Sequence, residues 1–357
     1  YGLDAKNLNI CSLFVLEGLY KLKPKGVLGF LLPKVFIKNE AYYPVRKVIL
    51  EKYQIKQIAD FGQFPGVASD AIAIIIANQQ RRSNIKISFF ENDKLLKQNK
   101  VSQALFLKNP LMVFSLALNN RLQRILDKIV KNTEPLGKIL KIKRGIELGQ
   151  KSIVAKCQFC GSYNEAETKY YGSLEKRCKI CGKKLAISQK NILQISSIEK
   201  RRGYDQKCIA GAHLHRYHIS EHYFIRTNLK GIDYKEDAFA FPRILVKRIS
   251  TKVEAAYSEE KLFAFNTVYS LFNENFNRDE YLLILGVLNS KLMHFFYEYY
   301  YNVGMSLTTQ VTIEFLSKLP IKKISKNFQK LLIKLVERML LLINKREQLD
   351  DKRIDVR

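Results

Sequence analysis

The sequence lacks long apolar runs, and it lacks the features of a protein start. No apolar stretch reaches the roughly 18 residues that a membrane span needs, so we expect no membrane partner. The chain opens with Tyr1-Gly2-Leu3-Asp4, which contains no initiator Met, no basic segment and no apolar signal segment. We therefore interpret the sequence as a piece of a protein whose upstream part is missing.

Acidic residues are also scarce. The 357 residues include 33 Asp and Glu against 61 Lys and Arg, which gives a formal net charge of +28. A charge of this size raises the local concentration of polyanions, and nucleic acid is the commonest polyanionic partner of proteins. A Lys-rich composition inherited from an AT-rich genome is the alternative explanation, and the many Lys, Ile, Asn and Tyr residues agree with it.

Cysteine is rare, and its placement is uneven. Of six cysteines, Cys11 and Cys208 stand alone, while Cys157, Cys160, Cys178 and Cys181 fall within one short segment. This is not the pattern of a secreted disulfide framework, so we expect a cytoplasmic protein. Cys208, next to a lysine, has no mark of a nucleophile, and we interpret it as a structural thiol.

The four clustered cysteines form two Cys-x-x-Cys-Gly repeats in "CQFCGSYNEAETKYYGSLEKRCKICGKKL". Each repeat places two thiolates on one turn, and the glycine permits the positive φ with which the chain folds back. Four thiolates leave no open coordination position, so the spacing predicts a structural Zn²⁺ in a zinc ribbon at 155–186. Two disulfides or a redox pair are the alternatives, but disulfides need an oxidising compartment and a redox motif would not occur twice.

Hydrophobic patterning predicts an α/β layer at the beginning of the chain. Residues 8–23 have helical spacing, "GVLGFLLP" is an apolar strand, and "NEAYYPVRKVILEKY" is a second helix. The segments "IKQIADFG" and "DAIAIIIANQQ" are further strands. We expect 1–100 to form a twisted, mainly parallel sheet that is covered by helices on both faces.

The pattern changes after these strands, and we divide the rest of the chain into three parts. Residues 101–133 form a helical connector, and 134–322 form a mixed α+β domain into which the zinc ribbon is inserted. Leu331, Leu335, Leu342 and Ile343 lie on one side of a helix in 323–357.

The order of these segments resembles the TaqI-like adenine-specific DNA methyltransferases of restriction–modification systems. "SLFVLEGLYKLKPKGVLGFLLPKVF" and "IADFGQFPGVASDAIAIII" are similar to the second half of that family's catalytic domain. "LGKILKIKRGIELG", "GAHLHRYHI", "PRILVKRIS" and "LSKLPI" resemble its C-terminal specificity domain, in the same order. The zinc ribbon departs from the family pattern.

The resemblance implies the second half of a class I S-adenosylmethionine-dependent methyltransferase sheet, followed by a DNA-specificity domain. It implies methyl transfer from S-adenosylmethionine to the N6 amino group of an adenine that is flipped out of duplex DNA. Phe64 occupies the place of an aromatic residue that stacks on this adenine, although a core aromatic is the alternative. Tyr1 matches the last residue of the family's Asn-Pro-Pro-Tyr motif.

The sequence departs from the family in one large respect, because it contains neither Asn-Pro-Pro-Tyr nor the glycine-rich cofactor loop. We therefore expect this piece to be inactive alone and to supply mainly target recognition. The missing N-terminal half of the methyltransferase would bind most of the cofactor. A fused or separate nuclease is a further candidate partner.

Residues that contact DNA should carry positive charge or paired hydrogen-bond donors. The candidates lie beside glycines or aromatics in the specificity domain and are Lys141, Lys143, Arg144, Arg201, Arg202, Arg216, Tyr217, Lys247 and Arg248. A solvated basic face is the alternative for any single lysine. His213, His215, His218 and His222 fall close together, and we interpret them as surface or phosphate-contacting residues rather than a second metal site.

Two other functions remain open at this point. The chain could be a zinc-containing DNA-recognition subunit with no catalysis of its own, or an RNA-binding zinc-ribbon protein. The residues upstream of Tyr1 would distinguish a recognition subunit from a methyltransferase, because only the methyltransferase has the catalytic and cofactor motifs there. Competition between duplex DNA and RNA at fixed salt would identify an RNA-binding protein.

Overall fold

A computed structural model describes residues 10–63, 70–79, 84–91, 94–148, 152–166, 176–239, 242–302 and 310–354. The chain divides into a first unit, 1–133 with 294–309, and a second unit, 134–293 with 310–357. The division falls after Thr133, and 294–309 groups with the first unit. No helix in the described part of the chain has the length and apolar character to cross a membrane.

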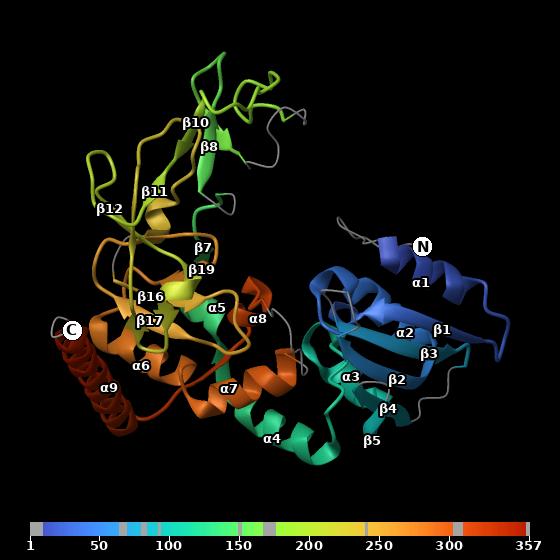
Figure 1. The fold of residues 1–357 in the computed structure, drawn as a ribbon. Coiled ribbons are helices and arrows are strands. Elements are labelled where there is room, and N and C mark those ends of the chain that lie inside the picture. The colour runs from blue at the N-terminus through green and yellow to red at the C-terminus, as the bar shows by residue number, and fades with distance from the viewer. Residues whose placement is uncertain are drawn as a thin grey trace. The chain divides into compact units, whose positions relative to one another are not determined.

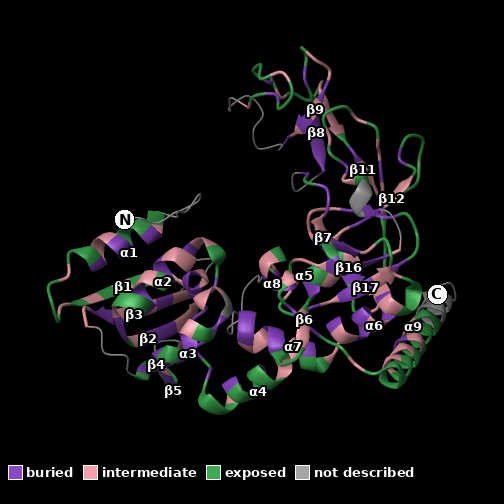
Figure 2. Cartoon of the chain, turned by 180° about the vertical axis from the view of Figure 1, so that it is seen from behind, coloured by how far each residue is buried: buried purple, intermediate pink, exposed green. Residues whose placement is uncertain are grey.

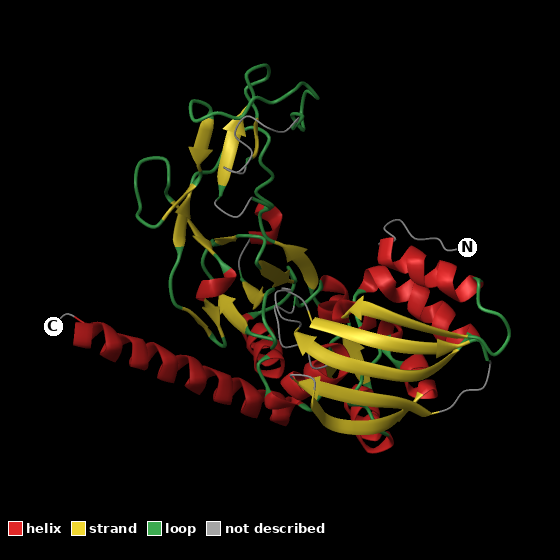
Figure 3. Cartoon of the chain, turned by 45° about the vertical axis from the view of Figure 1, so that its right-hand side comes forward, coloured by secondary structure: helices red, strands yellow, loops and turns green. Residues whose placement is uncertain are grey.

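The first unit is built on a five-stranded sheet in the order β1-β3-β2-β4-β5 (Figures 1 and 3). Its strands are β1 (Val27–Pro33), β2 (Gln54–Gln63), β3 (Asp70–Ala77), β4 (Asn84–Glu91) and β5 (Lys94–Ser102). Its helices are α1 (Ile10–Tyr20), α2 (Tyr43–Lys52), α3 (Gln103–Lys108) and α4 (Asn120–Val130), with short helical turns at η1 (Lys34–Ile37), η2 (Glu40–Tyr42), η3 (Pro110–Met112) and η7 (Glu298–Asn302).

The expectation of a mainly parallel sheet is wrong. Only β2 and β4 pair in parallel, while β3 pairs antiparallel with both β1 and β2, and β5 pairs antiparallel with β4. The reason is that β2 and β3 are joined by a short connection, which can only return the chain in the opposite direction. β1 and β2 themselves run in the same direction on either side of β3, and α2 provides the crossover between them.

The two faces of this sheet are not covered equally. Along β3, Ile72, Ile74 and Ile76 are fully buried, whereas the alternate residues are only half-buried (Figure 2). Because side chains alternate between the faces of a strand, one face forms the core and the other is partly covered. The sequence could not reveal this, since apolar residues occupy both faces of β3.

The second unit contains several small sheets. Their orders are β17-β16-β19-β7, β11-β15-β12-β18, β10-β8-β9, β13-β14 and β20-β6. The strands are β6 (Thr133–Pro135), β7 (Lys141–Arg144), β8 (Ile153–Lys156), β9 (Tyr163–Glu165), β10 (Ile192–Gln194), β11 (Ser196–Ser197), β12 (Gln206–Ile209), β13 (Leu214–His215), β14 (His218–Ile219), β15 (Tyr223–Ile225), β16 (Arg243–Lys247), β17 (Ala255–Ser258), β18 (Phe263–Ala264), β19 (Val268–Phe272) and β20 (Pro320–Lys322).

The helices of this part of the chain are interspersed with the strands, and the division after Met293 falls within one of them. They are α5 (Leu136–Ile139), α6 (Arg278–Leu288), α7 (Lys291–Tyr297), α8 (Ile313–Ser317) and α9 (Lys326–Ile354), with turns at η5 (Gly211–His213) and η6 (Glu236–Phe239). The last of them, α9, lies within 323–357, the segment for which the sequence predicts a helix. The apolar segment after Arg278 is not one continuous helix, because Asn289 ends α6 and its side-chain amide pairs with both backbone groups of Ala255, at 3.0 and 2.9 Å.

Candidate functional site

Two polar arrangements in the second unit bring together residues that are far apart in sequence. The first lies at one end of the sheet β17-β16-β19-β7. Arg144 is the last residue of β7 and is in register with Tyr269 of β19, which pairs in turn with Val246 of β16. Arg248 follows β16 at the same end. The antiparallel register therefore places Arg144 and Arg248 at the same end of the sheet, on either side of β19.

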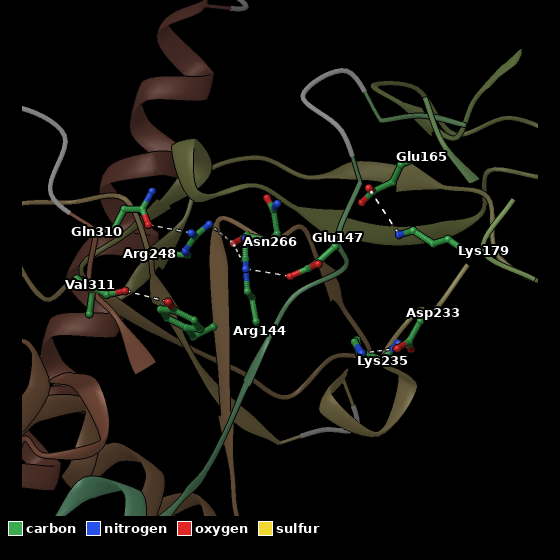
Figure 4. A network of polar contacts seen from close by, with 11 residues as sticks. Arg144, Glu147, Glu165, Lys179, Asp233, Lys235, Arg248, Asn266, Gln310 and Val311 are labelled. Atoms are coloured by element: carbon green, nitrogen blue, oxygen red, sulfur yellow. Dashed lines mark hydrogen bonds and ion pairs between the residues drawn. The ribbon is translucent and has the colours of Figure 1, made fainter. Parts of the chain in front are cut away.

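Both guanidinium groups donate to the same backbone oxygen. Arg144 Nε lies 3.4 Å and Arg248 Nη1 lies 3.2 Å from the carbonyl oxygen of Asn266, and Arg248 Nη2 donates to Gln310 Oε1 at 2.9 Å (Figure 4). The Tyr269 hydroxyl donates to the Val311 carbonyl at 2.9 Å. Burial raises the pKa of Tyr269, against the effect of Arg248 and Arg144. We call Arg144, Arg248, Asn266, Gln310 and Tyr269 the arginine cluster.

The Arg-Gly sequence of β7 has a steric reason. A Cβ atom on Gly145 would lie 2.2 Å from the carbonyl oxygen of Phe265, so no larger residue fits there. The close approach lets the Gly145 N–H donate to the Val268 carbonyl at 3.0 Å. It also holds the turn at Asn266 beside Arg144.

A cleft of about 510 Å³ adjoins the arginine cluster. Its charged side chains come in pairs: Arg144 lies 2.9 Å from Glu147, Lys179 lies 3.7 Å from Glu165, and Lys235 contacts Asp233 (Figure 4). Lys143 also lines this cleft. Donors and acceptors therefore alternate along its walls, in contrast to the excess of positive charge in the whole chain.

Other residues predicted to contact DNA lie elsewhere in the second unit. Arg202 is exposed in the turn between Arg201 and Tyr204, and Arg201 stacks over the Tyr204 ring at 4.4 Å. Lys247 pairs with Glu254 at 3.5 Å. Lys141 pairs with Glu274 at 3.0 Å.

Arg216 and Tyr217 form the turn of the β13–β14 hairpin. The guanidinium of Arg216 donates to the carbonyl of Asn289, at the C-terminal end of α6. Tyr217 has a φ of 67° and donates its N–H to Ala255 at 2.7 Å, and burial raises its pKa. Both residues thus contact the fold itself, whatever else they bind.

The second arrangement is the cysteine cluster. The Sγ atoms of Cys157, Cys160, Cys178 and Cys181 all lie within 4.8 Å of one another. Cys157 Sγ lies 3.7 Å from Cys181 Sγ, and Cys160 Sγ lies 3.7 Å from Cys178 Sγ. These separations are far too long for a disulfide bond. They match the spacing of about 3.8 Å that four zinc–sulfur bonds of about 2.3 Å give in a tetrahedron.

The backbone around the cysteines has the predicted turn geometry. Gly161 and Gly182 adopt φ values of 71° and 69°, and their N–H groups return to the carbonyls of Cys157 and Cys178 at 3.0 and 2.9 Å. A hydrogen bond with the Ser162 hydroxyl is the main cause that lowers the pKa of Cys178 to about 5. A thiol held in this way is readily available as the thiolate that binds a metal.

The ribbon has only a small core of its own. Besides Cys157 and Cys178, its buried residues are Ile153, Ala155, Ala166 and Leu185. This number of apolar side chains is too small to stabilise a separate module. A metal bound by the four cysteines would supply the missing stability.

The four histidines make other contacts. His213 lies 3.1 Å from both the Tyr223 hydroxyl and Glu221, and His215 stacks on His218 with ring centroids 6.2 Å apart. Among the described residues, only the four cysteines form a group that could hold a metal. Burial raises the pKa of Cys208 well above its usual range, in agreement with a structural thiol.

The first unit carries a buried polar cluster where β1 and β2 end. Lys34 Nζ lies 2.7 Å from Asp60 Oδ2 and 4.0 Å from Asp70 Oδ2, and all three side chains are almost fully buried. A cavity of about 280 Å³ beside Asp60 is lined by Phe89, Ser115, Leu116, Ala117, Glu298 and Tyr299. Tyr1 and Phe64 lie outside the described residues.

Sequence reasoning missed several members of the site. Asn266 and Gln310 are acceptors for the arginines, Glu147 pairs with Arg144, and Tyr269 lies between the two strands that carry them. Only Asn266 had a local signal, as a turn residue between two β-rich segments. The others depend on strand register, which a single sequence does not specify.

Two family models match the sequence. Residues 206–321 match the TaqI-like C-terminal specificity domain, and residues 1–66 match the Eco57I restriction-modification methylase. The resemblance stated from the sequence is therefore confirmed: the chain is related to the methyltransferases of restriction–modification systems and carries a specificity domain. No curated protein matches the sequence.

Solved structures share the fold at low sequence identity. The type IIL restriction-modification enzyme MmeI, in complex with DNA, is 10% identical with a TM-score of 0.57, over 96% of this chain and 46% of that chain. A nuclease-deletion mutant of the type ISP restriction-modification enzyme LlaGI, in complex with a DNA substrate mimic, is 12% identical with a TM-score of 0.51, over 95% of this chain and 32% of that chain. This chain thus spans less than half the length of either enzyme.

Proposed function

We propose that this chain provides target recognition in a restriction–modification methyltransferase that acts on the N6 amino group of adenine in duplex DNA. The observation that carries the proposal is the convergence of Arg144 and Arg248 on Asn266, within and next to the matched specificity domain. Paired arginine donors at one end of a sheet suit the edge of a base pair in the major groove.

The adjoining cleft supports base reading more than phosphate binding. A surface for phosphates alone needs positive charge, and acidic side chains would weaken it. Here Glu147 and Asp233 line the same cleft as Arg144 and Lys143. Carboxylates accept hydrogen bonds from the amino groups of bases, while Arg and Lys donate to guanine. A cleft with both kinds of group can distinguish sequences.

We further propose that the cysteine cluster holds one structural Zn²⁺. Four thiolates complete the tetrahedron, so the metal would fold the ribbon and would take no part in catalysis. The distances between the sulfur atoms support this assignment.

The first unit would contribute part of the catalytic domain, completed by an upstream half. The chain has no glycine-rich cofactor loop, so we assign S-adenosylmethionine mainly to that half and derive no step of methyl transfer from these residues. Among the described residues, β1 pairs on one edge only, with β3. Val27 and Leu31 on β1 are each 59% exposed, and Phe14 on α1 is 61% exposed. An apolar edge strand of this kind is a pairing site for another strand.

The test of target recognition is selection from a pool of random-sequence DNA duplexes. We expect the full chain to enrich one short sequence that contains adenine, and to prefer duplex DNA over structured RNA at fixed salt. A chain that binds all duplexes equally would contradict the recognition role. Preference for RNA would favour the RNA-binding alternative.

The proposed upstream partner is tested at the β1 edge. Replacing Val27 and Leu31 with lysine should block reconstitution of methylation when the upstream half is supplied as a separate chain, because charged residues on an edge strand prevent pairing. The control is Leu95→Lys and Leu96→Lys on β5, which are 51% and 63% exposed at the other edge. Equal methylation by both variants would contradict the pairing at β1.

A further inference from the structure

The ribbon carries an exposed surface that the metal site does not explain. Each Cys-x-x-Cys turn has a large apolar residue just before its second cysteine, and these residues, Phe159 and Ile180, are 55% and 57% exposed. A module with so small a core leaves these two side chains in solvent. Exposed apolar residues that are surrounded by polar ones commonly mark a binding surface.

Two contacts show that the two turns form one surface. Lys183, from the second turn, places its Nζ atom 4.6 Å from the centroid of the Phe159 ring in the first. The side-chain amide of Gln158 donates to the carbonyl of Lys184 at 3.3 Å. Residues 158–159 and 183–184 therefore lie side by side. We call Phe159, Lys183 and Lys184 the knuckle surface; Ile180 is the exposed apolar residue of the second turn.

The charge of the ribbon identifies the class of ligand. The sequence of 152–186 has three acidic residues, Glu165, Glu167 and Glu175, against seven basic ones, Lys156, Lys169, Lys176, Arg177, Lys179, Lys183 and Lys184. Lys183 and Lys184 are both exposed. This excess of positive charge differs from the paired charges of the cleft, and it fits a regular array of phosphates rather than base edges.

We propose that the knuckle surface is a second DNA contact, which binds the sugar–phosphate backbone of the duplex outside the sequence read by the arginine cluster. Lys183 and Lys184 bind phosphates, and Phe159 packs on the deoxyribose groups between them. The inference rests on the proposed function, because it requires that the chain binds duplex DNA. It assigns to the ribbon a role in affinity for flanking DNA, beyond its folding by zinc.

The test compares two duplexes that carry the selected sequence. The short duplex ends at that sequence, and the long duplex extends it on both sides. We expect Phe159→Ala/Lys183→Ala/Lys184→Ala to weaken binding of the long duplex about tenfold and to lower the slope of log affinity against log salt by about two, one for each lost phosphate contact. Binding of the short duplex should stay as in the unaltered chain.

The matched control is Phe328→Ala/Lys330→Ala/Lys334→Ala on α9, which also removes one exposed phenylalanine and two exposed lysines. It should bind both duplexes like the unaltered chain. Zinc content shows whether each variant keeps its ribbon, and Lys183→Glu/Lys184→Glu provides a second variant if the triple substitution loses zinc.

The outcomes separate the two proposals. If the knuckle variants with intact zinc bind the long duplex with unchanged affinity and salt dependence, the inference is wrong and the surface serves another partner, such as a protein. If the unaltered chain binds neither duplex, the proposed function fails, and the inference fails with it.

Discussion

The buried polar cluster of the first unit and the arginine cluster of the second unit use charged side chains differently. In the first unit, Lys34, Asp60 and Asp70 are at most 7% exposed and satisfy one another. In the second unit, Arg144 is 35% exposed, and its partner Glu147 is 59% exposed. Removing one member of a buried group leaves an uncompensated charge, whereas an exposed pair can exchange its partner for a ligand. Burial thus separates charges that hold the fold from charges that can bind.

The cysteine cluster should give the largest loss of stability, because the proposed metal holds together a ribbon that also carries a proposed DNA-binding surface. Chelating the metal, or replacing Cys178 with serine, should unfold the ribbon with a loss on the order of 10 kcal/mol of folding free energy. Elemental analysis should find one zinc per chain in the unaltered protein and none in the variant. The unfolding of the first unit should not change.

Cys11→Ser is the control, because this half-buried cysteine lies in the first unit, outside the cluster. It should keep one zinc. A Cys178→Ser chain with an intact, protease-resistant ribbon would show that the small apolar core suffices without a metal.

The buried polar cluster should give the next largest effect. Asp60→Asn leaves Lys34 without its nearest carboxylate, so we expect the first unit to lose about 3–5 kcal/mol of stability. Glu17→Gln is the matched control, because Glu17 pairs with Lys21 at 2.9 Å on the surface, and it should cost less than about 1 kcal/mol. Denaturant unfolding measures both. Similar losses in the two variants would contradict the distinction by burial.

Features that depend on local sequence could be predicted, and features that depend on strand pairing could not. Residue types and spacing sufficed to predict that the four cysteines meet and that the glycines after them have positive φ, because the geometry of each turn is local. Of the five strands of the first unit, β1, β2 and β3 were predicted from the sequence, but the direction of β3 was not, since pairing direction depends on the connection to β2. Arg144 and Arg248 were predicted singly. Their meeting at Asn266 depends on the register of three strands.

The arginine cluster should show the opposite response to the buried cluster. Arg144→Ala and Arg248→Ala should each weaken binding of the selected duplex by about 1–3 kcal/mol and relax its sequence preference, because each removes paired donors. Each variant should lose only about 1 kcal/mol of stability, far less than the buried cluster, because each arginine also donates to the Asn266 carbonyl. Lys190→Ala, an exposed lysine of the same unit, is the control and should change neither property.

Lysine substitution sharpens this prediction. Arg144→Lys and Arg248→Lys keep the charge but lose the planar pair of donors, so they should retain most of the affinity for random duplexes and lose the sequence preference. If lysine restores the preference fully, the cluster contributes only charge, and base reading must occur elsewhere in the second unit.

Arg216→Ala gives the smallest expected loss of stability. It tests whether an exposed arginine can hold the fold rather than bind DNA. The residue is exposed in a hairpin turn, yet its guanidinium donates to the Asn289 carbonyl, at the negative end of the α6 dipole. Arg216→Ala should therefore cost the second unit about 1 kcal/mol, the value of one charged hydrogen bond at a helix end. Arg202→Ala, in an exposed turn, should cost nothing measurable. Arg216→Ala could instead weaken duplex binding as much as Arg248→Ala and leave stability unchanged. In that case Arg216 binds DNA in the complex, and its hydrogen bond to Asn289 does not mark it as a residue that holds the fold.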